Sequence, residues 1–225
     1  MRIDRAGWPF ITGPLAPAAV LAAAGRAGGR RGLRLAAWPF ALLSAYMALF
    51  FRDPDRRCDV EAPAPDDVLS PADGVVMVAG EPQEGVAPEP APEGDWQQVS
   101  VFLSVVDVHV NRSPYHGEVV ESSYRRGSFL AAYRKESAHR NERSELWLRD
   151  GDRTVVFRQI VGVLARRIVT RTGVGRRLAT GERMGLMKFG SRMDVFVPRD
   201  CTVLVRVGQR VRGGETVIAR WSGAR

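Results

Sequence analysis

The sequence predicts a mainly β domain, of the α+β class, that follows an N-terminal helical hairpin. Residues 8–24 and 35–51 form two apolar segments, and neither contains a charged residue. From residue 59 onward, short apolar runs alternate with Gly, Pro and Asp, which is typical of strands joined by tight turns. We therefore expect a hairpin over residues 1–58 and a β domain over residues 59–225.

The hairpin has the composition of a membrane anchor. Each apolar segment is at the short end of the roughly 17–25 residues that cross a bilayer, and Trp and Tyr near the segment ends are typical of interfacial anchoring. The net charge of the chain is +8, and residues 1–58 hold most of the excess, with nine Arg against three Asp. Basic charge beside apolar sequence indicates anionic lipid rather than nucleic acid as the partner.

The orientation of the hairpin stays open. The turn between the segments contains Arg26, Arg30, Arg31 and Arg34, which favours a cytoplasmic turn and would place the β domain outside if both segments span. A hairpin that enters only one leaflet avoids this conflict. The alternative is a pair of buried helices packed on the soluble domain.

The β domain reads as a series of short elements. We expect strands at Gly74–Val78, Val99–Leu103, Gly117–Val120, Leu146–Arg149 and Thr154–Phe157, the last two as a hairpin across an Asp-Gly-Asp turn. The Pro-, Glu- and Gly-rich segment Glu81–Asp95 predicts a mobile surface loop. One short helix is expected around Phe129–Ala138.

The C-terminal segment predicts the architecture. A strand at Thr202–Val207, turns at Gly208-Gln209 and Gly213-Gly214, and a strand at Glu215–Ala219 follow one another. This rhythm is that of the hammerhead in lipoyl- and biotinyl-type domains, which are β-barrels or sandwiches. Lipoyl attachment itself is not expected, because no Lys follows Lys188.

The sequence contains too few cysteines for a disulfide framework and too few histidines for a His-rich metal site. Cys58 and Cys201 are too few for a disulfide framework and have no metal-ligand spacing. The only histidines are His109, His116 and His139, so a metal site is not expected.

The pair Gly190–Ser191 carries the strongest chemical hypothesis. It precedes an alternation of Met193, Val195 and Val197 that predicts a strand. The Ser191 hydroxyl could attack the Gly190 carbonyl and shift the acyl group from nitrogen to oxygen. β-Elimination would then leave dehydroalanine, which hydrolyses to a pyruvoyl group. The alternative is an ordinary tight turn, and the second pair Gly127–Ser128 shows that the dipeptide alone does not decide.

Two further residues are candidates for acid and base. Asp73 lies in Ser70-Pro71-Ala72-Asp73-Gly74, where an Asp-Gly turn is the simpler explanation. His109 directly follows an expected strand. A single His is more often structural, but imidazole is the side chain best suited to accept a serine proton near neutral pH.

Taken together, these segments resemble phosphatidylserine decarboxylase, particularly the short forms of bacteria and archaea. The resemblance covers nearly the whole chain and rests on five ordered motifs, which are Phe50-Phe51-Arg52-Asp53-Pro54, Ser70-Pro71-Ala72-Asp73-Gly74, Asp107-Val108-His109-Val110-Asn111-Arg112, Asn141-Glu142-Arg143 and Phe189-Gly190-Ser191.

The resemblance implies a role for each candidate. Ser191 would be the self-cleaving nucleophile and the source of a covalent pyruvoyl cofactor, with Gly190 the end of a large chain (1–190) and Ser191 the start of a small chain (191–225). Asp73 matches the acid that supports the base. Arg112 occupies the position of the family's second His, so His109 is assigned to both self-cleavage and decarboxylation. His116 is the reserve candidate, and His139 is expected on the surface.

The resemblance also implies the reaction and its setting. The pyruvoyl ketone would form a Schiff base with the serine headgroup of phosphatidylserine, CO2 would leave, and His109 would return a proton to give phosphatidylethanolamine. Expected partners are membrane phosphatidylserine and the chain's own two fragments, without nucleic acid, and a homo-oligomer is left open. We expect a location at the cytoplasmic side of the cell membrane. Two alternatives remain, a related ether lipid that carries serine and a non-catalytic membrane-attached β scaffold.

Overall fold

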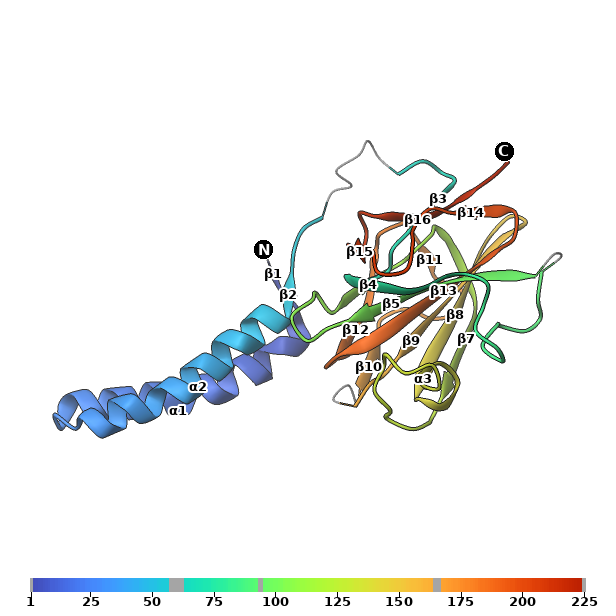
Figure 1. Cartoon of the computed structure of the whole chain (residues 1–225). Helices are drawn as coiled ribbons and strands as arrows, with labels where there is room; N and C mark the ends of the chain where they lie inside the picture. Colours follow the sequence, from blue (N-terminus) through green and yellow to red (C-terminus); the bar gives the residue numbers. More distant parts are fainter. Residues whose placement is uncertain (1, 57–62, 93–94, 164–166, 224–225) are drawn as a thin grey trace. The chain divides into compact units, whose positions relative to one another are not determined.

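The computed structural model describes residues 2–56, 63–92, 95–163 and 167–223 (Figure 1). They form two compact units, Met1–Asp55 and Arg56–Arg225, which we describe separately. The expected boundary between residues 58 and 59 lies outside the described residues, as does Cys58.

The first unit is the expected helical pair. It contains β1 (Arg2–Ile3), the 3₁₀ turn η1 (Arg5–Gly7), α1 (Trp8–Ala27), α2 (Arg31–Phe50) and β2 (Arg52–Asp53). The short strands β1 and β2 pair antiparallel and hold the two ends of the unit together. A side chain at Gly7 would place its Cβ 2.5 Å from Cβ of Phe51, so this glycine permits the close contact that buries Phe51.

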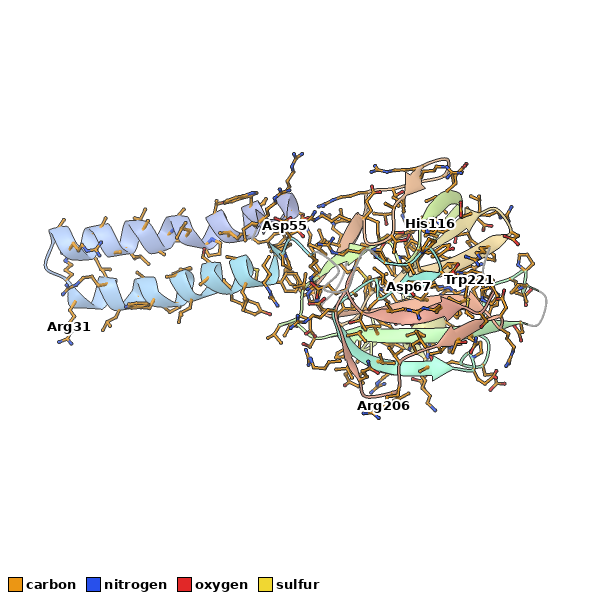
Figure 2. The ribbon with its side chains drawn as sticks, turned by 90° about the horizontal axis from the view of Figure 1, so that it is seen from above. Arg31, Asp55, Asp67, His116, Arg206 and Trp221 are labelled. Carbon is orange, nitrogen blue, oxygen red and sulfur yellow. The ribbon has the colours of Figure 1, made fainter. Side chains whose placement is uncertain are left out.

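Both helices are apolar around their circumference, except for the arginines near their connecting turn. Arg5–Ala27 and Arg31–Phe50 are each long and apolar enough to cross a membrane. Their large side chains project outward along the whole hairpin (Figure 2). The exposed ones are Trp8, Phe10, Leu15, Val20, Leu35, Trp38, Phe40, Leu42, Leu43 and Leu49. A helix that is apolar around its whole circumference is typical of a membrane span or of a core helix, and here only 17% of each apolar window is buried within the structure.

The second unit is mainly β, as predicted. An eight-stranded antiparallel sheet has the order β11-β7-β8-β9-β13-β5-β4-β15 and curls on itself (Figure 1). Its strands are β4 (Gly74–Gly80), β5 (Trp96–Leu103), β7 (Gly117–Arg125), β8 (Arg143–Asp150), β9 (Arg153–Ile160), β11 (Arg177–Leu178), β13 (Ser191–Pro198) and β15 (Arg210–Val211).

Two three-stranded sheets complete this unit. One has the order β10-β12-β6, and the other has the order β14-β16-β3. Their strands are β3 (Asp67–Leu69), β6 (Val110–Arg112), β10 (Arg167–Thr170), β12 (Arg183–Lys188), β14 (Cys201–Val203) and β16 (Val217–Trp221). The pairing of β14 with β16 and of β15 with β4 gives the expected strand–turn–turn–strand order at the C-terminus.

Two local predictions need correction. The helix expected at Phe129–Ala138 is wrong in position, because the only helix here is the single turn α3 (Ser137–Arg140). The preceding residues are held instead by the Asn141 side chain, whose Oδ1 accepts from Leu130 N at 2.9 Å and whose Nδ2 donates to Leu130 O at 2.8 Å. The strand expected to reach Val207 ends at Val203, because the chain leaves β16 after a last bond from Leu204 N to Ile218 O at 2.9 Å and then bonds to β4 from Gly208 N to Val76 O at 2.8 Å.

A buried ion pair lies on strand β13. Met193, Val195 and Val197 face the main apolar core, and Arg192 and Asp194, which alternate with them along the strand, are also fully buried. Nε of Arg192 lies 2.6 Å from Oδ1 of Asp194. The surrounding polar partners are Gln83 and Ser100 for Arg192, at 2.6 and 2.9 Å, and Gln98 for Asp194, at 3.1 Å. Part of the loop predicted at Glu81–Asp95 therefore covers this pair, with Val86 buried as well.

We expect Asp194→Ala to lower the free energy of unfolding by about 3–5 kcal/mol, because it leaves the Arg192 guanidinium buried without its counter-charge. The double variant Arg192→Met, Asp194→Leu should recover most of this loss, since it removes both charges. Urea denaturation of the three proteins measures the difference. A single variant as stable as the parent would contradict this account of the pair.

Candidate active site

Ser191 is the first residue of the central strand β13, and it is fully buried. Its backbone pairs with Leu103 of β5. Its Oγ has no hydrogen-bond partner among the described residues. The preceding Gly190 has φ +66°, a left-handed conformation that glycine adopts without strain. The expected nucleophile is thus a buried, unpartnered hydroxyl directly after a glycine turn.

His109 lies against the same turn. Its Nε2 accepts the N–H of Gly190 at 3.1 Å, and its Nδ1 lies 3.0 Å from the carbonyl oxygen of Asp107. A carbonyl oxygen only accepts, so Nδ1 carries the proton and Nε2 presents its lone pair. The structure therefore brings together three of the four expected residues, Gly190, Ser191 and His109, with the basic nitrogen of the imidazole facing the residue that precedes the serine.

Asp107 is a positioning residue to which sequence reasoning gave no role. Its Oδ2 accepts from N and Oγ of Ser104 at 2.9 and 2.6 Å, and its Oδ1 accepts from Arg210 at 2.6 Å. These bonds fix the turn whose carbonyl holds the His109 ring. The signal in the sequence was its place two residues before His109.

Asp73 lies at the same end of the sheet but has other partners. The Arg56 guanidinium binds its carboxylate with both Nη atoms, of which Nη2 lies 2.6 Å from Oδ2, and Gly213 N donates to Oδ1 at 2.9 Å. Asp73 directly precedes β4, and β5 separates β4 from β13. Two strand spacings, or roughly 10 Å, therefore separate the backbones of Asp73 and Ser191. Sequence reasoning did not find Arg56, because only the fold brings it beside Asp73.

An apolar cavity of about 170 Å³ opens beside Gly190. Its walls come from β5, from the segments around residues 131–133 and 162–163, and from the turn before β13, and the lining residues are Phe102, Val105, Ala131, Ala132, Tyr133, Gly162, Val163, Phe189 and Gly190. Tyr133 and Val163 also expose more than half of their surface, at 63% and 51%. The cavity therefore connects the serine turn to an apolar rim that faces solvent.

Asn141 and Gly162 hold the cavity walls in place. Besides its bonds to Leu130, Asn141 Nδ2 donates to Val161 O at 2.8 Å, so one buried amide joins two wall segments. A Cβ on Gly162 would lie 2.6 Å from the carbonyl oxygen of Gly190, so only glycine permits this approach to the bond before Ser191.

The other polar candidates lie in different surroundings. His116 binds Asp150 at 3.1 Å and contacts the Tyr115 ring in a tilted arrangement, and His139 is exposed on α3. Arg112 donates to Gly181 O at 3.0 Å. Burial raises the pKa of the Cys201 thiol. In the parts of the chain that the structure describes, no group of three His, Cys, Asp or Glu side chains is arranged to hold a metal ion.

A pyruvoyl group derived from residue 191 fits the residues present. The Ser191 hydroxyl is buried and has no competing partner among the described residues, and the neighbouring cavity is apolar.

Known proteins are similar to this chain over most of its length. The phosphatidylserine decarboxylase family model matches residues 43–219. The phosphatidylserine decarboxylase proenzyme of Solibacter usitatus is 43% identical over 186 residues, which cover 83% of this chain and 84% of that protein. Proteins of the same name from Paramagnetospirillum magneticum and Symbiobacterium thermophilum are 43% and 44% identical, covering 96% and 97% of this chain and 86% and 95% of theirs. The chain therefore belongs to the phosphatidylserine decarboxylase family.

Proposed function

We propose that this chain decarboxylates phosphatidylserine to phosphatidylethanolamine after cutting itself between Gly190 and Ser191. Beyond membership of the family, one structural observation supports this proposal for the chain itself. The Ser191 hydroxyl is buried and unpartnered among the described residues, and it directly follows a glycine whose N–H is bound by His109.

The self-cleavage needs only atoms of the chain and one water. Oγ of Ser191 attacks the carbonyl carbon of Gly190, the C–N bond breaks, and the proton of the hydroxyl passes through a base to the Ser191 nitrogen. Removal of the Cα proton of residue 191 then breaks the Cβ–Oγ bond, and Gly190 leaves as a carboxylate. Water replaces the nitrogen of the resulting dehydroalanine and releases ammonia. No oxidant is required, and the products are the chains 1–190 and 191–225.

His109 is the proposed base for the first step and the proton donor in the decarboxylation. Its Nδ1–H is held by the Asp107 carbonyl, so Nε2 is the basic nitrogen beside residue 190, and it would exchange its hydrogen bond from Gly190 N–H for the proton of the Ser191 hydroxyl. Asp73 is the proposed acid. Because its carboxylate is bound by Arg56 and Gly213, we propose that it acts in this ion-paired form and that Arg56 positions it.

A pyruvoyl group at residue 191 supplies a ketone that takes up the electrons released when the serine headgroup loses CO2. The chain's own residues prepare the surroundings. Phe102, Val105 and Phe189 line the cavity beside Gly190 with apolar surface. A dry wall of this kind favours the loss of charge as a carboxylate becomes CO2.

The substrate would arrive from the membrane. Tyr133 and Val163 form an exposed apolar rim at the cavity, and the two helices of the first unit are long and apolar enough to anchor the chain in a bilayer. We place the enzyme at the cytoplasmic side of the cell membrane, with residues 1–58 as the anchor and 59–225 as the catalytic domain. The small chain would remain bound, since its strands pair with strands of the large one.

We expect the purified protein to appear in denaturing mass spectrometry as two fragments, the smaller one starting in a blocked residue 191 that borohydride reduces. Ser191→Ala should remain one intact chain, because it lacks the attacking oxygen. Ser128→Ala, at the other Gly-Ser pair, is the control and should cleave normally. An uncut parent chain without a reducible carbonyl would exclude the proposed enzyme and favour a scaffold.

Asp73→Asn should slow self-cleavage by about 10²–10⁴-fold, the usual contribution of a group in acid–base catalysis. Arg56→Gln should slow it by about tenfold to 100-fold, because a hydrogen bond to a charged group contributes roughly 1.5–3 kcal/mol. Arg199→Gln removes an arginine from a more exposed ion pair with Glu81 and should leave the rate unchanged. Conversion of the precursor is followed on denaturing gels.

The double variant Asp73→Asn, Arg56→Gln tests whether the two residues act together. Its rate should match that of Asp73→Asn alone, since Arg56 would act only through the carboxylate. If the two single variants slow self-cleavage by factors that multiply in the double variant, Arg56 does not act through Asp73. Normal self-cleavage of Asp73→Asn would exclude Asp73 as the acid.

Gly162→Ala should slow self-cleavage on the order of 100-fold, because the new Cβ displaces the Gly190 carbonyl and small misplacements of reacting atoms have effects of this size. Gly173→Ala is the matched control, since a Cβ there meets nothing within 4 Å. Thermal unfolding of both variants, recorded beside the rate of cleavage, separates a local displacement from a general loss of stability. Equal cleavage rates in the two variants would refute the effect.

A further inference from the structure

The turn of the helical hairpin concentrates positive charge without any negative charge nearby in the chain. Arg26, Arg30, Arg31 and Arg34 lie within nine residues, and no Asp or Glu occurs between residues 5 and 52. Among the described residues of this unit, no ion pair or hydrogen bond engages the guanidinium group of any of the four. Arg31 projects from the far end of the hairpin (Figure 2). The charge of this turn is therefore available to an anion from outside the chain.

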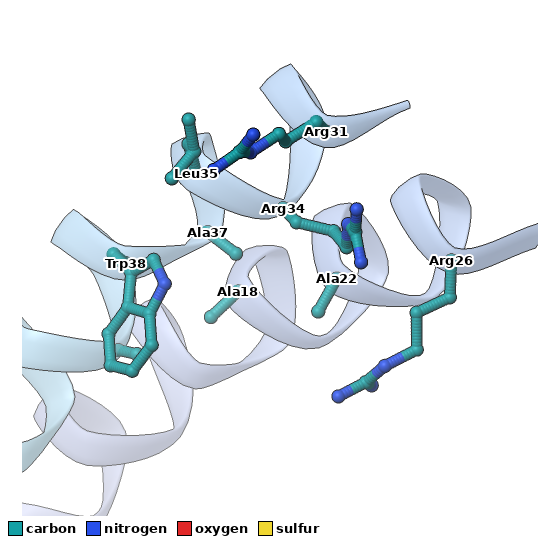
Figure 3. Close-up of a pocket in the computed structure, with 9 residues that line it drawn as sticks. Ala18, Ala22, Arg26, Arg31, Arg34, Leu35, Ala37 and Trp38 are labelled. Carbon is teal, nitrogen blue, oxygen red and sulfur yellow. The ribbon is translucent and has the colours of Figure 1, made fainter. Parts of the chain in front are cut away.

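Three of these arginines line a cavity between α1 and α2. Its volume is about 700 Å³, and Arg26, Arg31 and Arg34 surround it together with Leu35 and Trp38 (Figure 3). The remaining lining residues are small, which lets the helices lie close together, and they are Ala18, Ala22, Ala37 and Ala41. The cavity thus combines a cationic edge with apolar walls.

Packing fixes Arg34 at this place. A Cβ on Gly25 would lie 2.7 Å from Cγ of Arg34 and 2.9 Å from its backbone N, so the stem of this arginine rests directly on the α1 backbone. Arg30, the N-cap of α2, makes no side-chain cap. The first-turn N–H groups of α2 thereby add their partial positive charge at the same end of the helix.

We propose that this cavity binds the phosphate group of an anionic phospholipid in the bilayer. Guanidinium groups match phosphate oxygens in a forked geometry, and Leu35 and Trp38 offer apolar surface to the glycerol and acyl carbons next to that phosphate. A nucleic acid does not fit, because the same helices expose Val20 and Leu42 by more than 60% of their surface. The ligand is therefore a lipid whose net charge is negative.

The length of the helices places the cavity at a headgroup layer. Twenty helical residues span roughly 30 Å, the thickness of the hydrocarbon core. The turn of an inserted hairpin would therefore lie level with a layer of lipid phosphates. This inference rests on the proposed membrane attachment and not on the proposed reaction, because the helical unit carries none of the reacting residues.

Flotation of the full-length protein with vesicles tests the site. The readout is the ratio of partition onto phosphatidylcholine vesicles that contain phosphatidylglycerol to partition onto phosphatidylcholine alone. We expect the triple variant Arg26→Gln, Arg31→Gln, Arg34→Gln to lower this ratio on the order of 100-fold, given about 1 kcal/mol for each arginine near an anionic surface. High salt should reduce the ratio of the parent protein.

Two further variants separate a phosphate site from general charge. Arg125→Gln, Arg126→Gln, Arg206→Gln removes the same charge from exposed positions of the β domain (Arg206 is labelled in Figure 2) and should keep the parent ratio. The variant Arg26→Lys, Arg31→Lys, Arg34→Lys keeps the charge but lacks the forked guanidinium groups. Its partition ratio should fall between those of the parent and the glutamine variant. Self-cleavage in every variant shows that the β domain is folded.

Three outcomes would overturn the inference. They are an unchanged ratio in the glutamine variant, an equal loss in the β-domain control, and full retention in the lysine variant. A parent protein that floats with neither vesicle type would refute membrane attachment and this site together, while its self-cleavage would leave the proposed reaction standing. Equal partition of the parent onto both vesicle types would refute the site alone.

Discussion

The position of strand β13 between two hydrogen-bonded neighbours is the constraint on which the rest of the site depends. β13 pairs along its length with β5 and over five residues with β9, and all eight of its residues are buried. Ser191 therefore begins the most enclosed strand of the sheet, with a backbone that neighbours hold from its first residue. The glycine before it marks the change from turn to strand, so the bond between them joins a residue in the left-handed conformation to a residue paired in the sheet.

Polar groups are buried around this strand in two different ways. On one side of β13, Arg192 donates to Asp194 and Asp194 accepts from Gln98, while Nη1 of Arg192 is buried without a partner among the described residues. At the strand's start, Ser191 Oγ is buried and has no partner among the described residues. Unsatisfied buried polar atoms cost stability, and native proteins retain few of them. Arg192 keeps several bonds beside its unpartnered nitrogen, whereas the single polar atom of the Ser191 side chain has none among the described residues.

The sequence predicted those features that local patterns encode. Alternating apolar residues predicted β13, the Asp-Gly-Asp turn predicted the β8–β9 hairpin, and motif order led to Ser191 and His109. Contacts between distant segments left no such pattern. Arg56 meets Asp73 and Gly162 meets Gly190 only after the sheet has closed. The helix expected near residue 129 failed for the same reason, because the Asn141 side chain, rather than helical hydrogen bonds, satisfies the backbone there.

The strand pairing also determines what a cut before Ser191 would leave behind. Downstream of that bond, β13 lies between β5 and β9, β15 adds to β4, and β16 adds to β3. After cleavage, the C-terminal peptide would contribute strands to two sheets of the domain, so it could dissociate only if the domain unfolded. Its new first residue would be the end of a chain, but it would stay buried in the domain and held by strand pairing. The fold could thus create a terminal functional group without the disorder that chain ends normally have.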